Sequence, residues 1–192
     1  MSDRLYSFVF KGLLAEEALD KAGRKNRAHY TAEEETKISD ALAIDEIDVD
    51  LIFRAKKMAI VYTAISAFEN SVRAFISKKL LEEVGEDWWL IAVDEGIRKK
   101  AEGRMSEEKK IRWHTPRGDS PINYTEMKHL TDTIRKNWKY FEPHLYVLDW
   151  AANILDTVER SRNVIMHSGE LGNRDIERLG THMRDWIRQV GS

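Results

Sequence analysis

The sequence predicts an all-α fold, a helical bundle built on two long antiparallel helices. Apolar residues recur three or four positions apart along two stretches, at roughly 48–84 and 143–168. Only 3 prolines and 10 glycines interrupt the 192 residues, which leaves room for helices of that length. No segment alternates apolar and polar residues over a length that would indicate a β-strand.

The composition indicates a helix-rich protein with a sizeable core and mixed charge. Hydrophobic residues make up 42% of the chain and charged residues 33%, with a net charge of −2, which excludes a dedicated basic nucleic-acid coat. The absence of cysteine excludes disulfides, thiol nucleophiles and thiolate metal sites, and it fits a cytoplasmic location. The best candidate apolar run, Leu5 to Leu14, is interrupted by Lys11. It is shorter than the roughly 20 residues of a membrane span, so no membrane association is expected.

The N-terminal part differs in charge from the rest of the chain. Residues 1–50 contain 7 Lys and Arg against 12 Asp and Glu. We expect residues 1–47 to form a helical extension that packs on a main domain at residues 48–192. A short helix should follow Ser2, and a second helical stretch should end near Gly23.

Two helix signals follow. The segment Thr31-Ala-Glu-Glu34 has the pattern of a capping box, which predicts a helix that runs to about Ala43. The stretch 48–84 should then form one long helix, or two collinear ones, ending at Gly85. Its apolar face comprises Leu51, Ala55, Met58, Tyr62, Ile65, Val72, Ile76 and Leu80.

One charged residue lies on this apolar face. Glu69 falls between Ile65 and Val72, and Arg73 follows four residues later at the edge of the face. One interpretation is a local pair of Glu69 with Arg73, worth a few tenths of a kcal/mol. The other is a buried carboxylate that needs a partner from elsewhere in the fold.

Residues 85–124 are expected to form short helices and loops, with an insertion loop from Thr115 to Pro121. Between residues 98 and 117 there are eight Lys and Arg against three Asp and Glu, and Trp113 and His114 lie among them. Basic residues mixed with an aromatic residue suit an RNA backbone and a stacked base. The alternative is a solvated helix face. The RNA-binding candidates are Arg98, Lys99, Arg104 and Arg117.

Three helices complete the expected bundle. Thr125 should cap a helix that carries Met127, Leu130, Ile134 and Trp138. Glu142-Pro143 should open the next helix, and Gly169 should end it in the left-handed conformation. Asn173 should cap the last helix. The large apolar residues Trp138, Phe141 and Trp150, close to the second of these helices, suggest a dimer interface.

The helix at 143–168 carries the polar pattern of most interest. Arg162 follows Val158 by four residues and precedes Ile165 by three, so it should lie near the middle of an apolar face, where it needs a partner. Glu69 is the expected partner. Asn163 and His167 are four residues apart on a neighbouring face, and His167 lies in the last turn. Without further information, a core ion pair and a capping histidine would explain this pattern.

The segment Arg162-Asn163-x-x-x-His167 resembles the Arg-x4-His signature of the HEPN superfamily. The segment Ile65-Ser-Ala-Phe-Glu69-Asn-Ser-Val-Arg73 resembles the first core helix of HEPN domains, with its internal Glu and Arg. Residues 122–141 are similar to the lead-in helix of a branch that includes the C-terminal domain of a nuclear RNA-surveillance endonuclease. The resemblance covers roughly residues 50–190.

The resemblance implies a HEPN-like helical bundle that forms a homodimer, with the motifs of two protomers facing one cleft. It implies a metal-independent endoribonuclease without a cofactor, of toxin or host-defence type, with an antitoxin or defence-system partner protein. His167 would be the general acid and base, and Arg162 would hold the scissile phosphate. Asn163 would orient His167 or a phosphate oxygen. Glu69 and Arg73 would support them. The alternative is a non-catalytic RNA- or nucleotide-binding module within a larger complex. The six histidines show no metal-ligand spacing.

Overall fold

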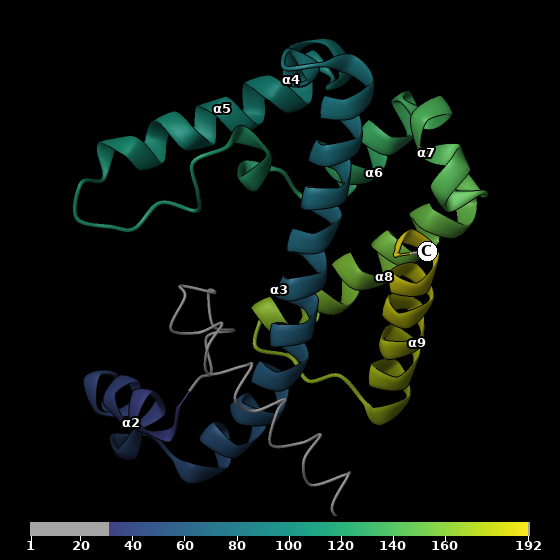
Figure 1. The fold of residues 1–192 in the computed structure, drawn as a ribbon. Coiled ribbons are helices and arrows are strands. Elements are labelled where there is room, and N and C mark those ends of the chain that lie inside the picture. Colours follow the sequence, from purple (N-terminus) through teal and green to yellow (C-terminus); the bar gives the residue numbers. More distant parts are fainter. Residues whose placement is uncertain (1–30, 192) are drawn as a thin grey trace, which may run out of the picture. The chain divides into compact units, whose positions relative to one another are not determined.

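The structure is a computed structural model that describes residues 31–191. The helices expected between Ser2 and Gly23 therefore lie outside the described residues. The chain divides into two compact units, Met1–Ile52 and Phe53–Ser192. All regular structure in the described part is helical, which confirms the all-α prediction (Figure 1). The packing of residues 1–47 on the rest of the chain stays a prediction.

The described part of the first unit contains a short α-helix and a turn. Helix α2 spans Ala32–Ala41, and the 3-10 helix η1 spans Ile44–Glu46. The capping box is present as predicted: the Glu34 amide donates to the Thr31 hydroxyl at 3.2 Å, and the Thr31 amide donates to the Glu34 carboxylate at 2.9 Å.

The second unit is organised around helix α3, Val49–Val84, whose first residues lie in the first unit. It is a single helix, and it ends at Gly85, which takes a φ of +93°. Five of the eight residues of its predicted apolar face are buried, whereas Leu51, Ala55 and Tyr62 are exposed. The buried side chains of α3 are Met58, Val61, Ile65, Phe68, Glu69, Val72, Ile76 and Leu80.

The segment after α3 contains more helix than the sequence predicted. Helix α4 spans Trp88–Ala92, and helix α5 spans Glu95–Lys110. The 3-10 helix η2, Pro121–Tyr124, packs against α5. We call residues 95–124 the arm (Figure 1). The expectation of short helices and loops was wrong for α5. Only Ile97 and Ala101 are buried in it, so its apolar signal is weak.

Helix α8 spans Leu148–Met166 and begins later than predicted. Pro143 does not open it, because this residue lies inside helix α7, Trp138–Leu145. The chain turns instead at Tyr146, which has a φ of +56°. Helix α6, Met127–Lys136, begins after Glu126 and not after Thr125. The two longest described helices, α3 and α8, run in opposite general directions, and α8 crosses α3 obliquely (Figure 1).

The C-terminus of α8 is closed by a Schellman-type turn. The Ser168 amide donates to the Ile165 carbonyl at 2.9 Å, and the Gly169 amide donates to the Val164 carbonyl at 2.8 Å. The left-handed residue is Ser168, with a φ of +60°, and not Gly169 as predicted. Glycine is still needed at 169, because a Cβ there would lie 2.8 Å from Val164 Cγ1.

The last helix, α9, spans Asn173–Val190 with Gly172 as its N-cap, so Asn173 is its first residue and not its cap. Its buried Trp186 packs edge-on against Phe68 of α3 and stacks on Trp150 of α8, with ring centroids 5.8 and 6.2 Å away. The aromatic residues expected at a dimer interface are thus core residues of one protomer: Phe141 is fully buried, and Trp138 and Trp150 are partly buried.

No helix in residues 31–191 combines the length and apolar character that crossing a bilayer requires.

Candidate functional site

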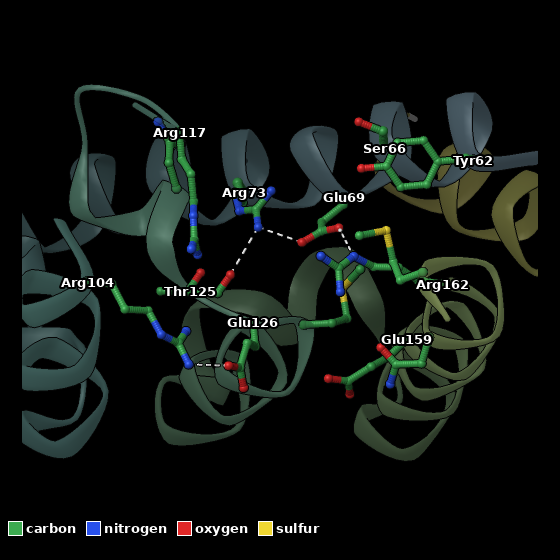
Figure 2. A pocket seen from close by; sticks show the side chains of 14 residues that line it. Tyr62, Ser66, Glu69, Arg73, Arg104, Arg117, Thr125, Glu126, Glu159 and Arg162 are labelled. Atoms are coloured by element: carbon green, nitrogen blue, oxygen red, sulfur yellow. Dashed lines mark hydrogen bonds and ion pairs between the residues drawn. The ribbon is translucent and has the colours of Figure 1, made fainter. Parts of the chain in front are cut away.

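A pocket of about 800 Å³ lies between α3, α8, the start of α6 and the arm (Figure 2). Four arginines and three glutamates line it, together with polar and apolar residues. The charged lining residues are Arg73, Arg104, Arg117, Arg162, Glu69, Glu126 and Glu159. The others are Tyr62, Ser66, Asn123, Thr125, Met127, Asn163 and Met166.

Glu69 joins the two long helices at the wall of this pocket. Its Oε2 lies 3.4 Å from Arg162 Nε on α8, which confirms the prediction that these charges approach each other. Its Oε1 accepts a hydrogen bond from Arg73 Nη2 at 2.5 Å, so the local pair forms as well. Arg73 Nη2 also donates to the Thr125 carbonyl at 3.0 Å. One buried carboxylate therefore holds two guanidinium groups (Figure 2).

Arg162 is less buried than the sequence predicted. Its side chain is 36% exposed, and it lies at the edge of the apolar face of α8. The middle of that face belongs to Ser161, which is buried and donates to the Thr157 carbonyl at 2.9 Å. Neighbouring residues of a helix are rotated by about 100° relative to each other. With Ser161 on the buried face of α8, Arg162 therefore lies at the edge of that face, at the pocket wall. The position suits contact with a ligand better than a core position would.

His167 lies apart from the pocket. It caps α8, and its amide donates to the Asn163 carbonyl at 3.1 Å, but its side chain is exposed and does not line the pocket. Asn163, in contrast, does line the pocket beside Arg162. The structure thus brings Arg162, Asn163, Glu69 and Arg73 to one pocket and leaves His167 outside it within one protomer.

Of the four RNA-binding candidates, two reach the pocket. Arg104 pairs with Glu126 and donates to the Tyr124 carbonyl at 3.0 Å. Arg117 pairs with Glu108 at 2.5 Å, and its guanidinium lies over the Tyr124 ring, 5.6 Å from the centroid. Both arginines come from the arm.

The other two candidates lie elsewhere on α5. Lys99 pairs with Glu95 at 2.6 Å on an exposed face. Arg98 is partly buried, and its Nε has no hydrogen-bond partner. Neither residue lines the pocket.

The arginines of the arm change the titration of their surroundings. The hydrogen bond from Arg104 lowers the pKa of Glu126. The backbone amide of Arg117 donates to Glu108 at 3.1 Å and lowers the pKa of that carboxyl. Burial, aided by the nearby Glu108, raises the pKa of Tyr124. The two lowered pKa values keep Glu108 and Glu126 charged beside the arginines, and the raised pKa keeps the Tyr124 hydroxyl neutral.

Sequence reasoning missed several residues of the pocket. Glu159 precedes Arg162 by three residues and Asn163 by four, so helical spacing could have placed it on the same face. Glu126 and Thr125 gave no such signal, because the turn between η2 and α6 decides where they lie. Among the described residues, no group of three or more His, Asp and Glu is arranged to hold a metal ion.

The comparisons with known proteins gave one match. A family model described as Swt1-like HEPN matches residues 63–191, more than half of the chain. The matched range contains every charged residue of the pocket and the segment Arg162–His167. Neither the curated proteins nor the solved structures contain a match to the chain.

Proposed function

Because the chain belongs to the Swt1-like HEPN family, we propose that it is a metal-independent endoribonuclease that cleaves RNA by attack of a ribose 2′-hydroxyl. The observation that carries the proposal is the ion pair of Arg162 Nε with Glu69 at the wall of the pocket. Such a pair fixes an arginine at a surface that a substrate can reach.

Arg162 is suited to hold a phosphate group. Its contact with Glu69 uses Nε, and neither terminal nitrogen has a hydrogen-bond partner among the described residues. A guanidinium has five N–H donors in one plane, so these nitrogens remain available for two phosphate oxygens. They would also stabilise the charge that develops in the transition state. Asn163, beside Arg162, would donate to a further phosphate oxygen.

His167 is assigned the proton transfers of the reaction. The 2′-oxygen attacks phosphorus while a histidine accepts the 2′-hydroxyl proton, and the bond from phosphorus to the 5′-oxygen breaks. The leaving 5′-oxygen takes a proton from the protonated histidine. The products are a 2′,3′-cyclic phosphate and a 5′-hydroxyl, and no oxidant, metal or water enters this step.

This assignment needs a second copy of the chain. Since His167 lies outside the pocket of its own protomer, we infer a homodimer in which two α8 ends meet. Val164 and Met166, both exposed apolar residues, lie in the last turn of α8 and would be covered by such a contact. Light scattering at micromolar concentration should give twice the mass of the chain. A biological role as a toxin or host-defence effector, with a neutralising partner protein, belongs to the same proposal.

The test is cleavage of total RNA in the presence of EDTA, with His167→Ala as the paired variant. General acid–base catalysis contributes about 10²–10⁴-fold, so the variant should lose at least 10²-fold of the rate. His167 is exposed, so its removal should leave the fold intact. DNA should not be cut, because it lacks the 2′-hydroxyl. Equal degradation by both proteins would reveal a contaminating nuclease and overturn the proposal.

A second candidate function is a non-catalytic RNA- or nucleotide-binding module. The observation in its favour is that each of the four pocket arginines already has a carboxylate partner, while His167 lies outside the pocket. RNA binding without cleavage, under the same conditions, would favour this function over the first.

A further inference from the structure

The end of the arm exposes a tryptophan. Helix α5 ends at Lys110, and the chain turns through Ile111, Arg112, Trp113 and His114 before the loop returns to η2. Trp113 is 86% exposed, and the His114 ring lies edge-on to it with centroids 5.7 Å apart. We call residues 109–114 the arm tip. A single exposed aromatic residue is not by itself a site.

The charges around Trp113 supply a second observation. Within the described residues, Lys109 and Arg112 have no carboxylate partner, whereas Lys110 pairs with Glu107 at 2.6 Å. In the pocket, every arginine is paired with a carboxylate. Lys109 and Arg112 therefore place free positive charge beside Trp113, whereas the arginines of the pocket are paired. Arg98 and Lys100, nearer the start of α5, also have no carboxylate partner among the described residues.

The loop behind the tip is held in place. Arg117 contacts Glu108 of α5 through both its backbone amide, at 3.1 Å, and its side chain, at 2.5 Å. The Tyr124 hydroxyl donates to the Gly118 carbonyl at 3.3 Å. A Cβ at position 118 would lie 2.0 Å from Asn123 Nδ2, so the chain passes closely there. These contacts fix the return of the loop, so the tip is organised before a ligand arrives.

We propose that the arm tip is a binding platform for single-stranded RNA, on which one base stacks against Trp113 while Lys109 and Arg112 contact the flanking phosphates. An exposed aromatic face with unpaired cations is the combination that single strands use. An interface with a protein would be expected to deplete lysine around its aromatic anchor, whereas Lys109 lies beside Trp113 in the chain. The inference rests on the proposed function in taking RNA as the substrate.

The platform and the pocket can serve one strand. Arg104 lines the pocket, and Lys109 follows it by five residues on the same helix. At 1.5 Å and about 100° per residue, Lys109 lies about 8 Å further along the axis and about 140° around it, so a strand that contacts both passes around the end of α5. The tip would hold the RNA outside the pocket and add affinity to the phosphate contact proposed for Arg162.

The experiment measures binding without cleavage. The probe is a 2′-O-methylated single-stranded RNA about ten nucleotides long, within the range that single-strand sites occupy, followed by fluorescence anisotropy. Loss of one stacked base weakens binding about 5- to 150-fold, so Trp113→Ala should raise Kd by that factor. Trp113→Phe should retain most of the affinity. Tyr146→Ala, at another exposed aromatic residue, should bind as the wild type does.

The charges are tested with a double variant at the arm tip and a control at a lysine that is already paired. Lys109→Gln and Arg112→Gln together should reduce the slope of log K against log salt by about 1.4, because each contact to a single strand contributes roughly 0.7. Lys37→Gln removes an exposed lysine of α2 that is already paired with Glu33 and should leave the slope nearly unchanged. An equal effect of both changes would show a general charge effect and overturn the site.

The outcomes separate this inference from the proposed function. If Trp113→Ala binds the probe as tightly as the wild type does, or if the wild type does not bind it, the platform is wrong even in a protein that cleaves RNA. If Trp113→Ala loses binding and the wild type cleaves no RNA, the platform stands and the endoribonuclease proposal fails. Circular dichroism should show unchanged unfolding of Trp113→Ala, because the side chain is exposed.

Discussion

The two sides of the pocket use the same chemistry in different surroundings. On the core side, Glu69 is buried and holds Arg73 and Arg162 at once, so three charges depend on one another. On the arm side, Arg104 and Arg117 each have their own carboxylate at the surface.

This difference in burial indicates what each arginine contributes to stability and to function. A buried charge without its partner is costly, whereas an exposed pair contributes little to stability. We therefore expect changes on the core side to affect folding and function together, and changes on the arm side to affect function with only a small change in stability.

The largest effect on stability should come from Glu69→Ala. The change leaves Arg73 and Arg162 without their shared carboxylate, and Arg73 is mostly buried. Removing one partner of a buried pair costs about 3–5 kcal/mol, and we expect a loss near 3 kcal/mol because Arg162 is partly exposed. Urea unfolding followed by circular dichroism measures it. Glu159→Ala is the control, because this glutamate lines the same pocket without an ion-pair partner among the described residues. A loss as small as that of the control would contradict a shared buried carboxylate.

Arg162→Ala should cost less than Glu69→Ala. Glu69 keeps Arg73 as a partner when Arg162 is removed, so the carboxylate is not left unpaired. We expect a loss of about 1 kcal/mol, the upper end for a partly exposed ion pair, together with loss of RNA cleavage. Arg162→Lys should recover much of the stability, since it restores a cation, but not the activity, since a lysine lacks the planar fork. Full activity in the lysine variant would argue against bidentate phosphate binding.

A smaller effect is expected on the arm side. Arg104→Ala breaks an exposed pair with Glu126, so the free energy of unfolding should fall by less than about 1 kcal/mol. Because Arg104 lowers the pKa of Glu126, this contribution is present above the unfolded pKa of the carboxyl. It is lost as the pH falls through the lower folded pKa. Wild type and variant should therefore differ at neutral pH and converge in acid. A difference that grows in acid would contradict the assignment.

The core side of the pocket was easier to predict from the sequence than the arm side. Helix α3 spans Val49–Val84 against an expected 48–84, because its apolar face is long and Gly85 ends it. The pairing of Glu69 with Arg162 followed from two charges that each needed a partner on an apolar face. The resemblance to the HEPN superfamily, expected over roughly residues 50–190, is confirmed by the family match over residues 63–191.

The arm and the two ends of α8 were less predictable, for physical reasons. Helix α5 is mostly solvated, so its sequence carries little periodic signal. Proline favours the first turn of a helix, but Pro143 lies inside α7, and the turn at Tyr146 has a positive φ without a glycine in the sequence to indicate it. The position of His167 outside the pocket of its own protomer depends on the end of α8, which sequence spacing does not describe.

The smallest effect concerns His129, where the arm meets the core side. His129 is buried at the start of α6, and its Nδ1 accepts a hydrogen bond from the Glu126 amide at 3.2 Å, closing a capping box. Burial lowers the pKa of His129 from its ordinary value of 6.5. The charged groups that act on it are Glu126, Lys100, Arg104 and Asp132. Because a protonated Nδ1 cannot accept, the neutral form belongs to the fold.

The sign of the pH dependence follows from this pKa. The unfolded chain binds a proton at His129 more readily than the folded one does, so stability is fully present above about pH 6.5 and declines as the pH falls through the unfolded pKa. His129→Gln should flatten this decline, since glutamine suits the same capping position and does not titrate. Unfolding midpoints measured roughly one unit either side of pH 6.5 provide the comparison. If the unfolding midpoint of His129→Gln depends on pH as steeply as that of the wild type, another group causes the decline. The capping box of α6 then does not make the stability depend on pH.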